Sequence, residues 1–173
     1  MKSKRLNNLG KINRDKTLNF TWDNKKLSGF EGDSLASALL ANNIGIVGRS
    51  FKYHRPRGIF SSGVEESGAL VTIGSKDRRD PNVRATTQEL FDGLKASGQN
   101  AFPNVNFDLG GINNYIGRFF AAGFYYKTFM GIPPFEWGKG TAIWMLFEKL
   151  IRKAAGMGSA SRLPDPDSYE HAH

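Results

Sequence analysis

The feature that most constrains the fold of this chain is an early pair of apolar–polar alternations separated by a turn signal. Residues 18–22 alternate apolar and polar side chains, and apolar residues return over 27–30. Asp23 and Asn24 lie between the two segments and are residue types that favour turns. Because alternation with a period of two places every second side chain on the same face of a strand, the pattern predicts a β-hairpin with one face available for a core.

A helix is predicted directly after this hairpin, within EGDSLASALLANN. Asp33 or Ser34 can cap its N-terminus, and Asn42-Asn43 marks its end. Its apolar residues recur at helical spacing and are Leu35, Ala38, Leu39 and Ala41.

Strands are predicted again after a long glycine-rich loop, over residues 69–73 and 82–86. The Gly, Ser, Lys, Asp and Arg residues of 74–81 predict a surface turn between them. The later strand is expected to close the sheet. The order strand, strand, helix, long loop, strand is typical of an α+β, β-grasp domain of the plant-type ferredoxin kind.

The glycine-rich loop HRPRGIFSSGVEESGALV has the layout of a plant-type iron–sulfur loop from which every cysteine is absent. The plant-type spacing is C-x4-C-x2-C followed by a distant fourth cysteine. On this sequence it falls on Ser61, Glu66 and Ala69, and Thr86 in NVRATT takes the fourth place. Alanine has no ligand atom, and hydroxyls bind iron far more weakly than thiolates. These four positions are therefore interpreted as vestigial, and no [2Fe–2S] cluster is expected.

Motifs on both sides of the loop carry a resemblance to a known family. They include GFEGDSLASALLANNI, VGRSFKYHRPRGIF, LVTI, NVRATTQELFDGLKASGQN, AGFYYKTFM and the tail IRKAAGMGSASRLPDPDSYEHAH. Over residues 10–173 the chain closely resembles the N-terminal domain of the alpha subunit of heterotetrameric sarcosine oxidase. That domain is a cysteine-free relative of the [2Fe–2S] β-grasp domain of opine and amino-acid dehydrogenase alpha subunits.

The resemblance implies a structural and interface segment of a larger oxidoreductase. Complexes of that family oxidise sarcosine to glycine by hydride transfer to a flavin, pass the one-carbon unit to tetrahydrofolate or release it as formaldehyde, and form hydrogen peroxide. The implied cofactors of the whole complex are FAD, FMN, NAD and tetrahydrofolate. The implied partners are the remainder of the alpha subunit and the beta, gamma and delta subunits. Since the substrate and cofactor sites lie elsewhere in the family, this chain alone is expected to bind none of these cofactors and to be inactive.

Composition and patterning predict four consecutive parts. Residues 1–16 form a basic N-terminal arm, and residues 17–98 form the ferredoxin-like β-grasp domain. Residues 99–156 form an aromatic extension that ends in a helix and is expected to lie against another protein surface. Residues 157–173 form a connector to a dinucleotide-binding domain, whose G-x-G-x-x-G fingerprint does not occur in this sequence. The chain is therefore expected to be a fragment or a separately encoded first piece of a longer subunit.

The net charge of +8 lies entirely in residues 1–60. A basic nucleic-acid-binding module would explain this charge, and a cluster-free β-grasp adaptor unrelated to amine oxidation would explain the fold, so both remain alternatives. The opening MKSKRLNNLGKINRDK has no apolar signal segment, and the longest apolar stretch, 142–147, is too short to span a bilayer. A cytoplasmic protein without membrane contact is expected.

Arg55 and Arg57 are the strongest binding candidates, because they flank a proline that restricts the backbone and a guanidinium group suits carboxylate or phosphate. The first interpretation is that they pin the former cluster loop by bonding its carbonyls, Glu65 or Glu66. The second is contact with a flavin phosphate across a subunit interface, and the third is contact with nucleic acid.

No catalytic residue and no metal site is predicted. His54 has no identifiable carboxylate partner in the sequence and is interpreted as an ordinary hydrogen-bonding residue. His171 and His173 form an H-x-H pair without further ligands. Glu65 and Glu66 are adjacent, and adjacent side chains in an extended segment point apart, so they make a poor acid/base pair.

Overall fold

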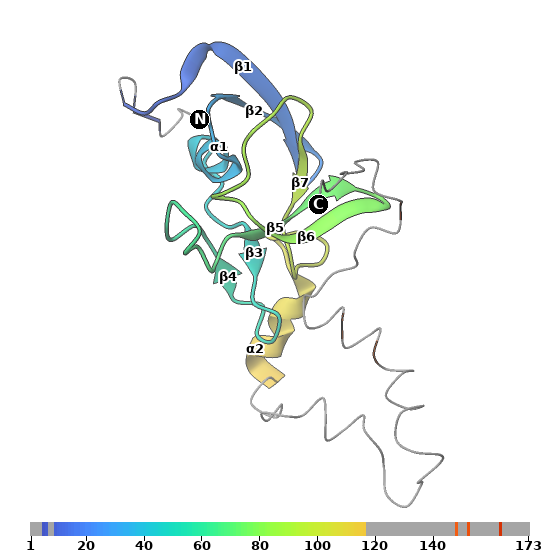
Figure 1. Ribbon diagram of the computed structural model, residues 1–173. Coiled ribbons are helices and arrows are strands. Elements are labelled where there is room, and N and C mark those ends of the chain that lie inside the picture. The colour runs from blue at the N-terminus through green and yellow to red at the C-terminus, as the bar shows by residue number, and fades with distance from the viewer. Residues whose placement is uncertain (1–4, 7–8, 117–147, 149–151, 153–162, 164–173) are drawn as a thin grey trace, which may run out of the picture.

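The computed structural model describes residues 5–6, 9–116, 148, 152 and 163. These residues form an α+β fold in which a five-stranded mixed sheet carries a helix on one face (Figure 1). The predicted β-grasp class is confirmed. The predicted helix ending at Gly156, the connector 157–173 and residues 117–147 of the aromatic extension lie outside the described residues, apart from Glu148, Arg152 and Leu163.

The N-terminal hairpin has the predicted form. β1 (Asn13–Trp22) pairs antiparallel with β2 (Lys25–Glu31), and Trp22 lies opposite Lys25. Asp23 and Asn24 join the strands with φ values of 45° and 66°. Two central residues with positive φ are typical of the type I′ turn that matches the twist of a hairpin. β1 begins at Asn13, inside the segment predicted as the basic arm.

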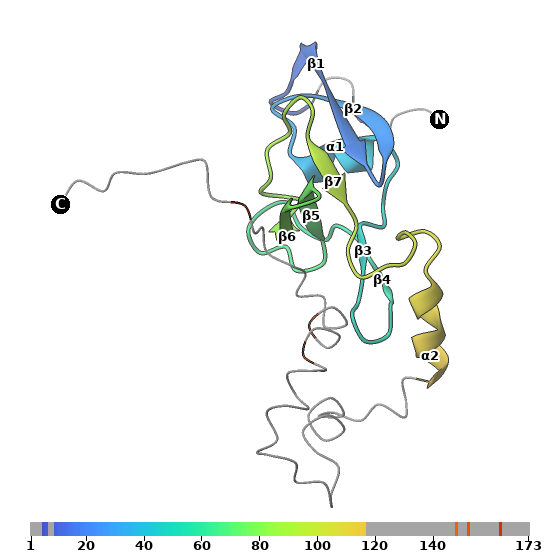
Figure 2. The same cartoon turned by 90° about the vertical axis from the view of Figure 1, so that its right-hand side faces the viewer.

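The predicted helix is α1 (Leu35–Ala41), and Ser34 caps it by accepting a hydrogen bond from the Ser37 N–H. Its buried residues belong to the same hydrophobic core as Phe20 and Trp22 of β1. Figure 2 shows α1 behind the strands of the hairpin. The core that results contains Leu18, Phe20, Trp22, Leu35, Ala36, Ala38, Leu39, Val47, Ala69, Val71, Ala85, Leu90, Leu94 and Ala96.

The region predicted as a surface turn over 74–81 is mostly strand, so that prediction is wrong. β5 (Leu70–Ser75) and β6 (Arg78–Arg84) pair antiparallel and leave only Lys76 and Asp77 between them. The polar composition misled because β6 is the edge strand, where exposed charges and a proline such as Pro81 are tolerated. The pairing register of β5 and β6 shifts between Val71 and Ile73, opposite the Pro81 region.

The strand that closes the sheet is β7 (Lys95–Ser97), which the sequence did not predict. The strand order is β2-β1-β7-β5-β6. β7 runs parallel to β1 and antiparallel to β5, so it joins the two hairpins. The expectation that residues 82–86 close the sheet is therefore wrong, because β6 lies at the edge.

A second, two-stranded ribbon contains β3 (Gly48–Arg49) and β4 (Pro56–Arg57). The turn η1 (Leu109–Ile112) and the short helix α2 (Asn113–Ile116) lie beside this ribbon in both views (Figures 1 and 2). In the part of the chain that the structure describes, no helix is both long and apolar enough to cross a membrane.

Candidate functional site

The four positions that correspond to cluster ligands lie around one loop between β4 and β5. Glu66 is 2% exposed and Ala69 is completely buried, while Thr86 follows β6 and is also buried. Ser61 is partly buried. The loop therefore keeps an interior, although none of its four positions carries a thiol.

The carboxylate of Glu66 occupies this interior. Its Oε2 accepts hydrogen bonds from the backbone N–H groups of Phe60 and Ser61, each at 2.7 Å. Its Oε1 accepts from the N–H groups of Gly68 at 2.5 Å and Ala69 at 3.1 Å. Both arms of the loop thus donate to one side chain, and the Ser61 hydroxyl adds a longer contact of 3.4 Å.

These donors fix the charge of Glu66. Burial raises the pKa of its carboxyl, but the backbone hydrogen bonds from Ser61, Gly68, Phe60 and Ala69 outweigh burial and lower the pKa to about 2. The side chain is therefore ionised at neutral pH, and the loop encloses a negative charge.

Contacts outside the carboxylate close the loop further. The Thr86 hydroxyl donates to the carbonyl oxygen of Gly63 at 2.8 Å, and Arg84 Nε donates to the carbonyl oxygen of Glu66 at 3.1 Å. At Gly68, an added Cβ would lie 2.8 Å from the Gly58 carbonyl oxygen and 2.8 Å from the Phe60 ring. Only glycine fits at this close approach.

The residues present do not fit an iron–sulfur cluster. A [2Fe–2S] cluster of the plant type needs four thiolates, and the chain has no cysteine. Ala69 offers no ligand atom, and both oxygens of Glu66 already accept two N–H groups each. Among the described residues, no group of three or more His, Asp or Glu side chains could hold another metal ion.

Arg55 and Arg57 do not pin this loop, so the first interpretation of these residues is wrong. Both are exposed, and the Arg55 guanidinium lies over the Tyr53 ring, 4.9 Å from its centroid. No hydrogen bond joins either side chain to the loop within the described residues, because backbone N–H groups already satisfy Glu66. The contact with a flavin phosphate or another partner group stays a prediction.

His54 has a carboxylate partner that the sequence did not reveal. Its Nδ1 lies 2.7 Å from Asp108 Oδ2, and the side chains are 19% and 2% exposed. Burial raises the pKa of Asp108, but hydrogen bonds from the Phe102 N–H, His54 and the Gly110 N–H outweigh it and lower the pKa. The pair ties the turn after β3 to the segment before η1. His171 and His173 lie outside the described residues.

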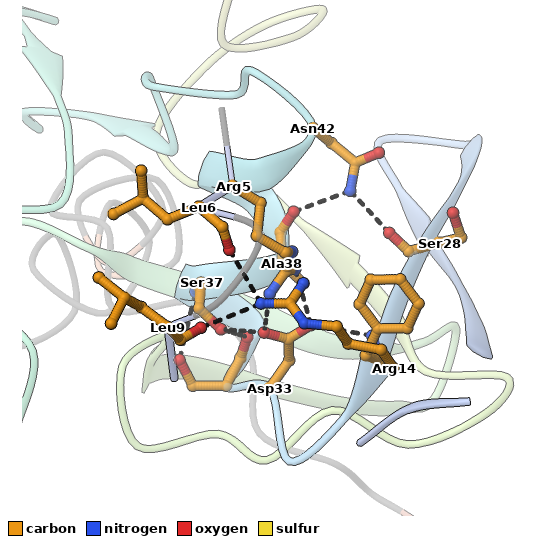
Figure 3. Close-up of polar contacts among 11 residues, drawn as sticks. Arg5, Leu6, Leu9, Arg14, Ser28, Asp33, Ser37, Ala38 and Asn42 are labelled. Carbon is orange, nitrogen blue, oxygen red and sulfur yellow. Dashed lines mark hydrogen bonds and ion pairs between the residues drawn. The ribbon is translucent and has the colours of Figure 1, made fainter. Parts of the chain in front are cut away.

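A second buried carboxylate lies at the start of α1, where Asp33 is 2% exposed (Figure 3). Arg5 donates to both of its oxygens at 2.8 Å, and the Phe30 N–H and the Ser37 hydroxyl complete the set. Burial raises the pKa of Asp33, but these hydrogen bonds outweigh it and lower the pKa. Arg14 donates to the carbonyl oxygens of Leu6 and Leu9, so the described part of the basic arm is tied to the fold.

Comparison with known proteins gives a family match over the β-grasp region. The model of the 2Fe-2S iron-sulfur cluster binding domain family matches residues 15–101. This range contains the whole five-stranded sheet except the first residues of β1, together with the loop around Glu66.

Curated relatives extend the similarity. Sarcosine oxidase subunit alpha of Rhizobium meliloti (strain 1021) is 52% identical over 170 residues, which cover 98% of this chain and 16% of the relative. The subunit of the same name from Corynebacterium sp. (strain U-96) is 49% identical over 90 residues, 50% of this chain and 9% of the relative. The chain thus spans less than a fifth of the length of these relatives. The resemblance inferred from the loop and its flanks is confirmed.

A solved structure, the L-proline dehydrogenase from P. horikoshii, is 27% identical in sequence. It matches 53% of this chain and 17% of its own, with a TM-score of 0.42.

Proposed function

Because the chain belongs to the family of 2Fe-2S iron-sulfur cluster binding domains but has no cysteine to hold a cluster, we propose that it is a structural and interface segment of a sarcosine oxidase alpha subunit. The similarity to Rhizobium meliloti sarcosine oxidase subunit alpha over 98% of the chain supports the choice of subunit. In this proposal the segment carries no [2Fe–2S] cluster, since it has no thiolate ligand for one.

The observation that carries this proposal is the intact loop around Glu66. A loop with inward-facing N–H groups and no cofactor stays closed only if other groups accept their hydrogen bonds. Here the loop is closed by hydrogen bonds to a buried carboxylate and by the Thr86–Gly63 contact. A loop kept in order without a cofactor fits a structural role in a larger assembly.

The parent complex, in this proposal, oxidatively demethylates sarcosine to glycine in the cytoplasm. It passes the one-carbon unit to tetrahydrofolate or releases it as formaldehyde, and it forms hydrogen peroxide. FAD, FMN, NAD and tetrahydrofolate bind elsewhere in the complex. The partners of this segment are the remainder of the alpha subunit and the beta, gamma and delta subunits.

The interface part of the proposal is supported by the exposed apolar side chains that follow β7. Large apolar residues within 102–115 are more than half exposed: Phe102, Phe107, Leu109, Ile112 and Tyr115. A run of large exposed apolar residues within one short segment is typical of a surface that another protein covers. We propose that the remainder of the alpha subunit covers them.

The exposed Arg55 and Arg57 belong to the same proposal. Their guanidinium groups are free of ion pairs within the described residues and can meet an anionic group of a partner, including a flavin phosphate. Replacing both with Ala in the whole complex is expected to weaken assembly or flavin retention. Replacing both with Lys keeps the charge but not the planar, bidentate guanidinium group, and it should weaken them nearly as much if that geometry is needed.

Iron reconstitution tests the absence of a redox role. The purified chain, treated anaerobically with iron and sulfide, is expected to stay colourless and free of iron. The matched control carries Ser61→Cys, Glu66→Cys, Ala69→Cys and Thr86→Cys, and it is expected to gain a visible charge-transfer spectrum. Stoichiometric iron in the unchanged chain would overturn the proposal.

Deletion in the whole complex tests the structural role. Removing residues 1–101 is expected to prevent assembly of the subunits, as measured by size-exclusion chromatography, while the isolated chain shows no oxidation of sarcosine with added flavin. Full assembly and turnover without the segment, or turnover by the segment alone, would contradict the assignment.

A further inference from the structure

Glu66 is a buried charge that no chemistry of this chain uses. Its side chain is 2% exposed, and within the described residues no Arg or Lys side chain forms an ion pair with its carboxylate. An uncompensated buried charge is strongly destabilising. The charge must therefore be stabilised by the dipoles around it.

Those dipoles come from two separate stretches of backbone. The N–H groups of Phe60 and Ser61 point at one oxygen, and the N–H groups of Gly68 and Ala69 point at the other. Successive backbone N–H groups that converge on one point form a nest, which is a common anion-binding arrangement. Of the residues between the two stretches, Ser62, Val64, Glu65 and Ser67 are exposed.

The same nest suits an iron–sulfur cluster. The cluster is ligated by thiolates, and hydrogen bonds to its sulfurs tune its potential. A loop that wraps a cluster must therefore turn N–H groups inward, and once the cluster is absent these groups are buried donors without an acceptor. If these N–H groups stayed unsatisfied, their desolvation penalty would destabilise the closed form of the loop.

We propose that the loop over residues 60–69 is a carboxylate-binding site with a built-in ligand, in which the Glu66 side chain takes the structural place of the cluster. The inference concerns the isolated chain and holds whether or not the segment assembles into the proposed complex. It assigns to Glu66 the role of an internal anion that keeps a cofactor loop closed.

The donor geometry selects a flat anion with two oxygens. Each Glu66 oxygen receives two N–H groups, from opposite arms of the loop. Two pairs of N–H groups, one pair on each oxygen, match the two oxygens of a carboxylate. Formate and acetate carry the same two oxygens and therefore match this donor set.

Chemical rescue of a Glu66→Ala variant of the full chain tests the proposal. Truncation leaves the nest empty, so thermal unfolding should occur at a lower temperature. Added formate should then raise the midpoint saturably, by about 5 °C at many times its dissociation constant. Formamide, a neutral molecule of the same shape, should have no such effect, and chloride at equal ionic strength corrects for salt.

Glu65→Ala is the matched control, because Glu65 is the exposed neighbour of Glu66. It and the unchanged chain should show no response to formate beyond that to chloride. Equal responses in all three proteins, or rescue by formamide as strong as by formate, would overturn the proposal.

If Glu66→Ala does not fold, hydrogen exchange in the unchanged chain decides the question. The amides of Phe60, Ser61, Gly68 and Ala69 should exchange slowly and as one group. Exchange of these four amides as fast as those of the exposed Ser62 and Ser67 would equally overturn the proposal.

Discussion

Two carboxylates, Glu66 in the cluster-free loop and Asp33 at the start of α1, are buried to the same extent but are stabilised in different ways. Each is 2% exposed. The strong donors to Glu66 are all backbone N–H groups from within ten residues of chain. Asp33 receives one backbone N–H, from Phe30, and otherwise relies on the side chains of Arg5 and Ser37.

The difference separates a fixed site from an adjustable one. A backbone N–H that is held by the turn of a loop cannot rotate away, so the loop needs an acceptor at each donor. A guanidinium group or a hydroxyl can turn toward water or toward another acceptor. The Glu66 site therefore demands an anion, whereas the Asp33 site tolerates a change of charge.

The largest expected effect comes from replacing each carboxylate by its amide. In Glu66→Gln, the new NH2 group must face two N–H donors wherever it lies, so we expect a loss of about 3 kcal/mol in the free energy of unfolding. In Asp33→Asn, Arg5 and Ser37 can reorient, and the expected loss is only about 1 kcal/mol. Urea denaturation of both variants measures the two values, and equal losses would remove the distinction between the sites.

Acid titration is expected to separate the two sites by a smaller effect. The pKa of Glu66 is lowered in the folded chain from 4.5 to about 2. Its contribution to stability is therefore complete above the unfolded value and is lost as the pH falls from about 4.5 to about 2. The pKa of Asp33 is also lowered, so its contribution to stability is likewise lost as the pH falls below its ordinary value of 3.8.

The Glu66→Gln variant isolates the part of this pH dependence that comes from the loop. It should lose less stability than the unchanged chain when urea midpoints are compared at about pH 7 and about pH 3. Identical pH dependence in the two proteins would mean that Glu66 is not the group that titrates.

The smallest expected effect concerns the Arg5–Asp33 pair. Arg5→Ala should cost about 1 kcal/mol, because Asp33 keeps its hydrogen bonds from the Phe30 N–H and the Ser37 hydroxyl and water can take the place of the guanidinium group. Arg5→Lys should recover only part of this loss, since it keeps the charge but not the bidentate geometry. The exposed Arg57→Ala serves as the control and should be neutral.

The salt dependence of stability is a further test of the difference between the Asp33 and Glu66 sites. The stability difference between Arg5→Ala and the unchanged chain should shrink slightly with added salt, since salt screens a mostly buried ion pair only weakly, whereas the cost of Glu66→Gln should stay constant because its partners are buried dipoles. A salt-dependent Glu66→Gln effect would contradict the fixed-site description.

Local signals in the sequence predicted the first half of the fold well. Asp23 and Asn24 sit at positive φ in the predicted turn, and Ser34 caps the predicted helix. Both signals act within four residues, so no tertiary information is needed. β7 escaped prediction because three residues carry no periodicity, and β6 was mistaken for a turn because an edge strand tolerates the composition of a loop.

The cluster spacing drew attention to the loop before β5 but did not predict its contacts. The cluster spacing placed Ser61, Glu66, Ala69 and Thr86 around one loop, but it did not show that Glu66 turns inward to bind the amides. That arrangement depends on the path of the backbone, which sequence spacing does not give. The partner of His54 was missed for a similar reason, because Asp108 approaches it only through the fold.

The position of β7 in the sheet also sets the order in which the chain can assemble during synthesis. The β1–β2 hairpin leaves the ribosome first and the β5–β6 hairpin follows, but neither pairs with the other directly. In the sheet, Thr21 of β1 pairs with Lys95 of β7, and Ile73 of β5 pairs with Ala96 of β7. Neither pair can form before residues 95–97 have been synthesised. Until those residues emerge, both hairpins expose unpaired edges and an open apolar face, which are templates for aggregation. The three residues of β7 thus complete the sheet last. A nascent chain halted before residue 95 is expected to depend on chaperones.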